Sequence, residues 1–400
     1  MQSTKLVSRR KPYREGYGAA LKAGLQQTTR QVQAMHHTIA DKSFNTLRRV
    51  PLLSLPARLV KRAHDAIADG VYAAIHHGGG LALTALDPLA RRALPEHHAR
   101  TIDSVLNGVF GDYLARSGNG LAIEMGFYHG GEKIPLSPAG LAPLLSNGGD
   151  KLCVFIHGLC CDEHCWMAGD DTADSVNFGQ RLQVELGYAP FYLRYNSGLG
   201  LNENGQQLAA QLDALLAACP QPPDEVVLIG HSMGGLIARR ACEHAAAHQS
   251  PWLALTRMVI CLGSPHAGAG LERLGQGLTR VMQYFDVSAP LARIASARSQ
   301  GIRHLRHGLR DTGGSAPPVP GLAYRFVGAS LSHTPEHPVY RLVGDGLVTL
   351  DSATEPGLAG DVASVRLTGI GHMTLLRSPM VFAQLRAWLS TDSPPDAQVL

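Results

Sequence analysis

Apolar residues recur at helical spacing through the first third of the chain. Three segments show this rhythm, at residues 21–39, 59–75 and 102–114. One apolar face per segment predicts three amphipathic helices, and three consecutive glycines at 78–80 would end the second of them. We therefore expect a helical N-terminal region over residues 1–118.

A different pattern begins near residue 120. Apolar segments at 121–128 and 133–136 flank Gly130 and Gly131, which predicts two strands joined by a glycine turn. Short apolar runs then alternate with helical stretches, and the runs fall at 152–156, 191–195, 226–229, 258–262, 324–327 and 362–367. Such alternation is typical of an α/β fold with a mostly parallel sheet flanked by helices.

One connection in this second part is unusually long. Residues 268–320 separate two predicted strands and are rich in Leu, Arg, Gly and Pro, so we interpret them as a lid or cap insertion. We expect a catalytic domain over residues 119–390 that contains this insertion. Residues 391–400 are expected to form a loose tail.

Composition narrows the class of protein. Hydrophobic residues make up 45% and charged residues 17%, as in ordinary globular proteins, and no apolar run approaches the roughly 18 residues of a membrane-spanning helix. The seven cysteines lack the spacing of a disulfide framework, which suits a reducing compartment. The first residues do not show a secretion signal, so we expect a cytoplasmic protein.

The net charge of +4 is unevenly distributed. The first 62 residues contain thirteen Lys and Arg residues against only Glu15 and Asp41. A basic helical arm of this kind could make peripheral contact with an anionic membrane, and we do not expect nucleic acid as a partner. The alternative, that these helices pack on the catalytic domain or form a homo-oligomer, stays open, and the sequence predicts no oligomeric state.

The strongest chemical signal is the run VVLIGHSMGG at residues 226–235. It predicts a strand, a sharp turn at Ser232 and a helix, and the small residues Gly230 and Gly234 let strand and helix approach closely. In this turn the Ser232 hydroxyl, between His231 and Met233, would be exposed at the carboxyl edge of the sheet. Ser232 is therefore the candidate nucleophile.

A serine nucleophile needs a base, and the base needs a carboxylate that orients it. His372 follows the last predicted strand in a glycine-framed loop, and Asp345 lies between Gly344 and Gly346 in another loop. Both come after Ser232, in the order serine, acid, histidine, which is one of the chain orders known for such triads. The rival acids are Asp286, Asp311 and Asp351.

Hydrolysis also needs two backbone donors for the oxyanion. One is normally the amide after the nucleophile, here that of Met233. The other is expected at an early junction of strand and loop, where His157 and Gly158 follow an apolar strand. Gly158 permits a turn that would point the Leu159 amide into the site.

Five blocks of sequence resemble lipases and esterases of the α/β-hydrolase superfamily, and more narrowly the lipase-like branch that includes GPI inositol-deacylase-type domains. They are FIHGL (155–159), GHSMGG (230–235), LGSPHAG (262–268), GDGLV (344–348) and GIGHMTLL (369–376). The resemblance implies cleavage of a small-molecule or lipid carboxylic ester through an acyl-enzyme, without a cofactor. Two alternatives stay open: an acyltransferase that uses the same acyl-enzyme, and a non-catalytic lipid-binding or scaffold protein.

A cluster of possible metal ligands lies beside the predicted oxyanion loop, and consists of His157, Cys160, Cys161, His164 and Cys165. Thiolate and imidazole groups are typical zinc ligands. The spacing matches no paired Cys-x-x-Cys pattern, however. We therefore expect these residues to line a pocket and expect no metal.

Overall fold

The computed structural model describes residues 96–146, 150–167, 176–269, 299–309, 318–335 and 339–390, together with seven isolated positions before residue 70. The chain forms two compact units. The N-terminal unit comprises Met1–Ala99 and Leu114–Ala122, and the sheet unit comprises Arg100–Tyr113 and Ile123–Leu400. The predicted boundary between residues 118 and 119 stays a prediction.

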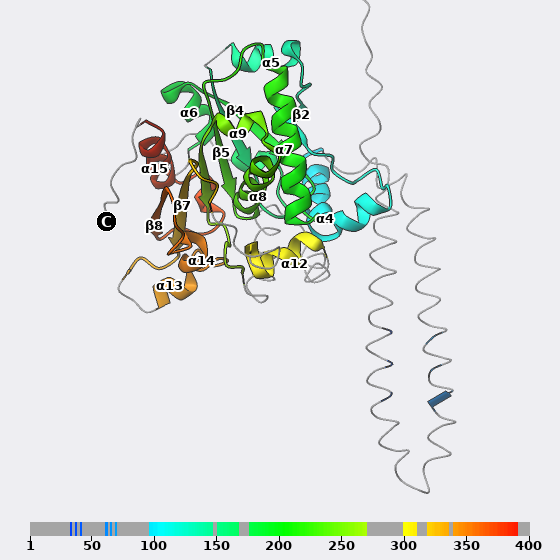
Figure 1. Cartoon of the computed structure of the whole chain (residues 1–400). Coiled ribbons are helices and arrows are strands. Elements are labelled where there is room, and N and C mark those ends of the chain that lie inside the picture. The colour runs from blue at the N-terminus through cyan, green and yellow to red at the C-terminus, as the bar shows by residue number, and fades with distance from the viewer. Residues whose placement is uncertain are drawn as a thin grey trace, which may run out of the picture. The chain divides into compact units, whose positions relative to one another are not determined.

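The sheet unit is built on eight strands (Figure 1). Their order across the sheet is β2-β1-β4-β3-β5-β6-β7-β8. β1 pairs antiparallel with β2 and with β4, and every other pairing is parallel. The strands are β1 (Gly126–His129), β2 (Glu132–Lys133), β3 (Lys151–Ile156), β4 (Tyr188–Arg194), β5 (Glu225–His231), β6 (Thr256–Leu262), β7 (Ala323–Ser330) and β8 (Val362–Thr368). The predicted mostly parallel sheet is confirmed.

Alternate residues of the central strands enter two different cores, because successive side chains of a strand point to opposite faces. In β3, Val154 and Ile156 join one buried cluster, and Cys153 and Phe155 join the other. Since both faces are buried, the strands appear in the sequence as continuous apolar runs, as is usual for parallel sheets.

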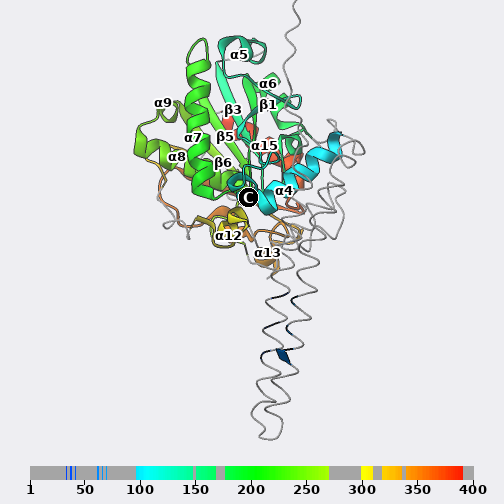
Figure 2. The ribbon, with the colours of Figure 1, turned by 90° about the vertical axis from the view of Figure 1, so that its right-hand side faces the viewer.

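Helices cover both faces of the sheet (Figures 1 and 2). The helices α7 (Leu201–Ala218) and α8 (Met233–His248) pack on the first cluster, and α6 (Phe178–Leu186) and α15 (Pro379–Ser390) pack on the second. Short helices fill the connections: α5 (Pro138–Leu145), η2 (Glu163–Trp166), α9 (Pro251–Ala254), α13 (Val339–Val343), α14 (Leu350–Thr354) and η4 (Thr374–Leu376). α4 (Glu96–Arg116) includes the predicted helix at 102–114 and extends it at both ends.

The predicted insertion at 268–320 is described only in part. Its residues 299–309 contain α12 (Gln300–His307), whose Ile302 and Leu305 are buried. The rest of its length, apart from 268–269 and 318–320, lies outside the described residues, as does the predicted tail at 391–400. None of the described helices combines the length and apolarity needed to cross a bilayer.

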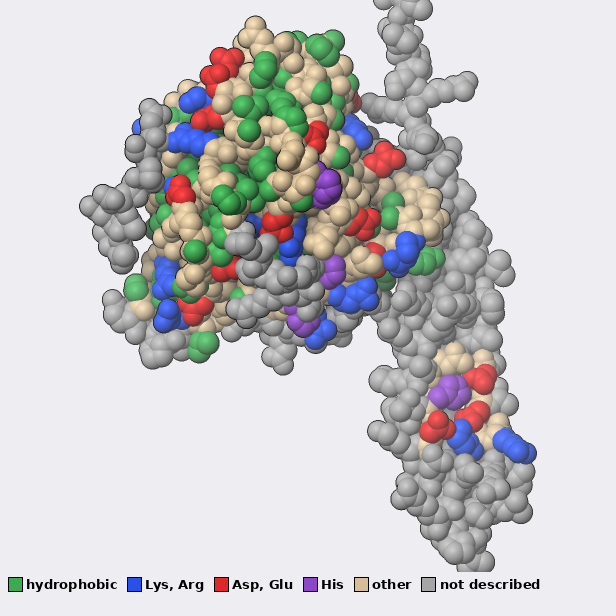
Figure 3. Space-filling view, viewed as in Figure 1, with side chains coloured by type: hydrophobic (Ala, Val, Ile, Leu, Met, Phe, Trp, Pro, Cys, Tyr) green, Lys and Arg blue, Asp and Glu red, His purple; other side chains and the backbone are tan. Residues whose placement is uncertain are grey.

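The N-terminal unit is described at few positions. Residues 33, 37, 41, 61, 62, 65 and 69 are helical. The contacts Lys61–Asp41 (2.8 Å) and His37–Asp69 (2.8 Å) link positions 37 and 41 to positions 69 and 61 in antiparallel order. Most of the basic residues proposed to contact a membrane lie outside the described positions. On the face of the sheet unit seen in Figure 3, acidic and basic side chains of the described residues are interspersed.

Candidate active site

Ser232 occupies a strained turn between β5 and α8. Its backbone angles, φ 53° and ψ −121°, lie in a region that L-residues rarely adopt and that costs about 1–3 kcal/mol. The Ser232 amide donates a hydrogen bond to the carbonyl oxygen of Leu262, at the end of β6, over 2.8 Å. Because β3, β5 and β6 are parallel, the turn lies at the edge where all three strands end.

The glycines beside Ser232 make this turn possible. A Cβ atom at Gly230 would lie 2.3 Å from the Gly235 nitrogen, and one at Gly234 would lie 2.1 Å from the carbonyl oxygen of Ile156. Both neighbours are backbone atoms, which cannot move without distorting the strand or the helix. The sequence-based prediction that small residues are needed at both positions agrees with these distances.

We expect Gly234→Ala to lower the free energy of unfolding by about 1–3 kcal/mol, the usual cost of overpacking, because the new methyl group would push the end of β3 away from α8. Urea unfolding at neutral pH measures the change. Gly126→Ala is the matched control, since the three atoms nearest to its Cβ would all belong to the flexible end of the Lys133 side chain. Equal stability of the two variants would contradict the predicted close packing at Gly234.

Asp345 and His372 form a hydrogen-bonded pair. His372 Nδ1 lies 2.7 Å from Asp345 Oδ2, and both side chains are largely buried. The other carboxylate oxygen of Asp345, Oδ1, accepts from the amides of Leu347 (2.9 Å) and Val348 (2.8 Å). The His372 amide also donates to the Asp345 carbonyl oxygen over 3.0 Å. The carboxylate is therefore held rigidly, with one oxygen left for the imidazole.

The Asp345–His372 pair lies next to the serine turn. Gly263 directly follows Leu262, the residue that accepts the Ser232 amide, and a Cβ at Gly263 would lie 2.9 Å from Asp345 Oδ2 and 3.4 Å from His372 Nδ1. His231, which precedes Ser232, contacts His372 directly, with ring centroids 4.6 Å apart. The structure thus brings together the three residues predicted from positions up to 140 residues apart.

The loop after β3 is held by two stacked aromatic rings, those of His157 and Tyr195. His157 stacks on Tyr195, which follows β4, with centroids 4.2 Å apart, and the Tyr195 hydroxyl donates to the His157 carbonyl oxygen over 2.7 Å. Burial lowers the pKa of His157, so the ring is neutral near pH 7. Its Nε2 faces the Tyr195 amide at 3.4 Å, and its Nδ1 lies 2.8 Å from the Gly158 carbonyl oxygen. His157 Nδ1 therefore carries the proton and donates it to that carbonyl.

This arrangement orients the Leu159 amide. In a trans peptide the carbonyl and the following N–H point in opposite directions, so a Gly158 carbonyl held by His157 turns the Leu159 N–H away from that ring. Gly158 lies against the Ser232 turn, since a Cβ there would be 3.1 Å from Ser232 Cβ. The Met233 amide is in the first turn of α8, where helix geometry leaves N–H groups without intrahelical partners.

The rival acid Asp351 is half-exposed in α14. It pairs with Arg341 at 3.2 Å and with Arg366 at 3.6 Å, so its carboxylate faces guanidinium groups instead of His372. The other two rivals, Asp286 and Asp311, lie outside the described residues.

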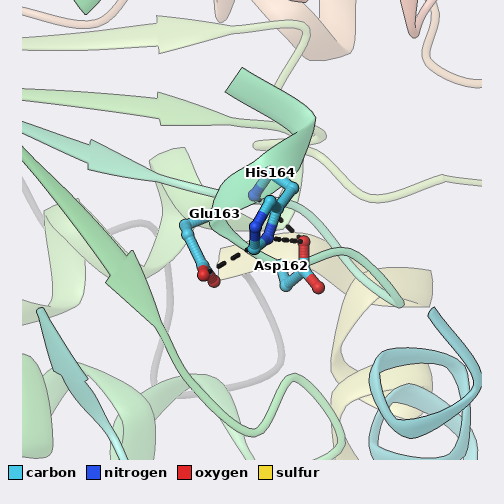
Figure 4. Close-up of side chains that lie close together, drawn as sticks. All are labelled: Asp162, Glu163 and His164. Carbon is cyan, nitrogen blue, oxygen red and sulfur yellow. Dashed lines mark hydrogen bonds and ion pairs between the residues drawn. The ribbon is translucent and has the colours of Figure 1, made fainter. Parts of the chain in front are cut away.

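Three consecutive residues, Asp162, Glu163 and His164, place possible metal-ligand atoms within 4.8 Å of one another (Figure 4). Cationic side chains already surround them. Arg194 binds both carboxylate oxygens of the buried Glu163, and Arg100 lies 3.2 Å from His164 Nε2. Burial alone would raise the pKa of Asp162, but His164 and Arg194 lower it to about 2. The group is therefore an ion-pair network in which guanidinium groups take the place of a metal cation.

The seven cysteines are free thiols, and those of the sequence-predicted cluster, Cys160, Cys161 and Cys165, are buried. Burial raises the pKa of Cys160 and of Cys165, which favours the protonated thiol over a metal-binding thiolate. These cysteines pack in the second hydrophobic core with Phe155 and Trp166.

The family model described as "PGAP1-like alpha/beta domain" matches residues 171–298, about a third of the chain, which include the Ser232 turn. Together with the strand order and the strained serine between β5 and α8, this match decides the fold. The chain has the α/β-hydrolase fold. The sequence-based resemblance to this superfamily is confirmed.

Several solved structures are similar to this chain. The mature lipase of Bacillus licheniformis is 20% identical, with 60% of this chain and 91% of that chain covered and a TM-score of 0.44. The thioesterase of the prodiginine pathway in Streptomyces coelicolor is 16% identical (60% and 90% covered, TM-score 0.40), and an esterase of Pyrococcus furiosus is 18% identical (61% and 80% covered, TM-score 0.38). No curated protein sequence matches the chain.

Two features of this candidate site are not predictable from the sequence. The first is the contact of Tyr195 with His157, which joins residues 38 positions apart and lies in no local sequence motif. The second is the close approach of α4, where a Cβ at Gly108 would lie 2.2 Å from Cys160 Sγ and one at Gly111 would lie 1.7 Å from Asn196 Oδ1. Glycines at i and i+3 of a helix are a signal for such an approach, but they do not identify the partner.

Proposed function

We propose that the chain is a serine hydrolase that cleaves carboxylic esters through an acyl-enzyme. Ser232 is the nucleophile, His372 the general base and Asp345 the carboxylate that orients it. The Leu159 and Met233 amides stabilise the oxyanion. The observation that carries this proposal is the 2.7 Å contact between His372 Nδ1 and Asp345 Oδ2, in a loop that lies against the Ser232 turn.

In the first half-reaction, Ser232 Oγ attacks the ester carbonyl carbon while its proton moves to His372 Nε2. The Asp345 carboxylate keeps the other ring proton on Nδ1 and stabilises the imidazolium. The two amides donate hydrogen bonds to the former carbonyl oxygen and stabilise its negative charge. His372 then gives its proton to the leaving alcohol. A water molecule repeats the sequence on the acyl-enzyme and releases the acid.

The geometry supports this assignment over a purely structural role for the same residues. A buried Asp345 with one oxygen saturated by two amides leaves the second oxygen for a single partner, and that partner is an imidazole. The strained Ser232 directly follows His231, whose ring contacts that of His372, and so supplies the nucleophile next to this pair.

A fluorophosphonate probe tests the proposal, because it phosphonylates only serines that a base activates. We expect the full chain to take up one label, on the peptide that contains Ser232, and to hydrolyse p-nitrophenyl esters. Ser232→Ala is expected to abolish both reactions while leaving circular dichroism unchanged. A chain-length series from acetate to palmitate then separates short-chain esterase from lipase activity.

The outcomes separate the alternatives. Added alcohols or amines that capture the acyl group in competition with water would assign acyl transfer at the same acyl-enzyme. A folded wild-type chain that takes up no label and cleaves no ester would reject the proposal and favour a non-catalytic binding protein.

A further inference from the structure

His231 makes a contact that the proposed reaction does not use. It is the last residue of β5, is almost fully buried, and immediately precedes Ser232. Its Nε2 lies 3.0 Å from the carbonyl oxygen of His372, across 141 residues of sequence. The two rings also pack on each other at 47°. One residue therefore links the nucleophile turn to the loop that carries the base.

The chemistry of this contact fixes the protonation of His231. A carbonyl oxygen only accepts hydrogen bonds, so Nε2 must carry the proton. His231 Nδ1 has no hydrogen-bond partner among the described residues and is then the bare nitrogen. Burial and the neighbouring His372 lower the pKa of His231 well below its usual value, which keeps the ring neutral. A neutral ring can hold this loop without placing a second positive charge beside His372 when that residue takes up a proton.

The loop that carries His372 depends on such contacts. Gly369 has a positive φ of 68°, and Gly371 has no side chain with which to pack. Two hydrogen bonds to the main-chain groups of His372 hold it in this loop. Its amide donates to the Asp345 carbonyl oxygen, and its own carbonyl oxygen accepts from His231. Losing the second bond would leave one side of the base free to shift relative to Ser232.

We propose that His231 is a positioning residue that fixes the distance between Ser232 and His372 by donating its Nε2 proton to the His372 carbonyl oxygen. This inference rests on the proposed function, because it concerns the alignment of that nucleophile with that base.

The test compares His231→Gln with His231→Asn in the full chain. The glutamine amide reaches about as far as Nε2 and can keep the hydrogen bond, whereas the shorter asparagine amide cannot. Both variants bury an amide of similar polarity. We expect His231→Asn to lower kcat for p-nitrophenyl esters by about 10²-fold, the scale of a small misplacement of a catalytic group, with little change in KM. His231→Gln is expected to restore most of the loss.

Two further measurements distinguish positioning from a general loss of structure. The rate of phosphonylation of Ser232 should fall in parallel with kcat, and the low-field proton NMR signal of the His372–Asp345 hydrogen bond should disappear in His231→Asn and persist in His231→Gln. A loss of folded protein would instead reduce the labelled fraction and all NMR signals in the same proportion. The labelling rate of each remaining folded molecule would then be unchanged. His248→Asn, at the exposed end of α8, controls for loss of a histidine.

The possible results are separable. A wild-type chain labelled at Ser232, with a slow Asn variant rescued by Gln, would support the inference. Equal labelling rates and an intact low-field signal in the Asn variant would overturn it and leave the proposed function standing. A wild-type chain that is not labelled at Ser232 would overturn the proposed function and this inference with it.

Discussion

Asp345→Asn is expected to reduce kcat for p-nitrophenyl esters by about 10⁴-fold while the protein stays folded. The reason is the arrangement of donors around the carboxylate. Oδ1 accepts from the Leu347 and Val348 amides, so the single oxygen of an asparagine would stay there. The NH₂ group would then face His372 Nδ1, forcing that nitrogen to accept. The ring proton would move to Nε2, where the serine proton has to go.

Steady-state kinetics with circular dichroism checks this expectation, and Asp351→Asn is the matched control. Asp351 is also a carboxylate in the same part of the chain, but it pairs with arginines at the surface. Its variant should keep wild-type turnover. Turnover lost in the Asp351 variant and kept in the Asp345 variant would transfer the acid role from one residue to the other.

The second large effect concerns acid stability. Burial lowers the pKa of three histidines, His157, His231 and His266, and the charge of Arg239 lowers that of His266 further. In the unfolded chain a histidine titrates near pH 6.5. Below that pH the unfolded state binds more protons than the folded state, so the free energy of unfolding falls as the pH falls. Each histidine lowers the free energy of unfolding by at most about 1.4 kcal/mol per pH unit, and the three together by at most about 4 kcal/mol per pH unit.

Urea unfolding at pH 7.5, 6.5 and 5.5, followed by tryptophan fluorescence, measures this dependence. All three tryptophans, Trp166, Trp252 and Trp388, are buried in the sheet unit, so the signal reports on that unit. The free energy should be nearly constant above pH 7 and fall below pH 6.5. His266→Gln should remove up to a third of the slope. A free energy that stays flat down to pH 5.5 would contradict the expectation.

The strands of the sheet were largely predictable, because burial on both faces requires short continuous apolar runs, and these stand out between the amphipathic helical stretches. The start of β4 was missed. Its first residues are Tyr188, Ala189 and Pro190, and a proline argues against a central strand. It is tolerated because β1 pairs only with residues 192–194, so on that side of β4 the strand ladder does not extend to residue 190.

The residues of the candidate site were predictable where a local sequence motif indicates them. Ser232 and its glycines form one continuous motif, and Asp345 and His372 each lie in a glycine-framed loop. Contacts between distant loops were not predictable. Two examples are the hydrogen bond from His231 to His372 and the hydrogen bond from Tyr195 to His157. These residue types are common, and it is the strand order that brings each pair together.

The strained backbone at Ser232 lowers the stability of the folded chain. A glycine adopts φ 53° and ψ −121° without the steric penalty of a side chain, so folding by itself favours glycine at position 232. The serine is thus a residue that the fold tolerates at the expense of stability. A chain that used this turn only as scaffolding would become more stable with glycine at this position, so the strained serine supports the proposed role of Ser232 as the nucleophile.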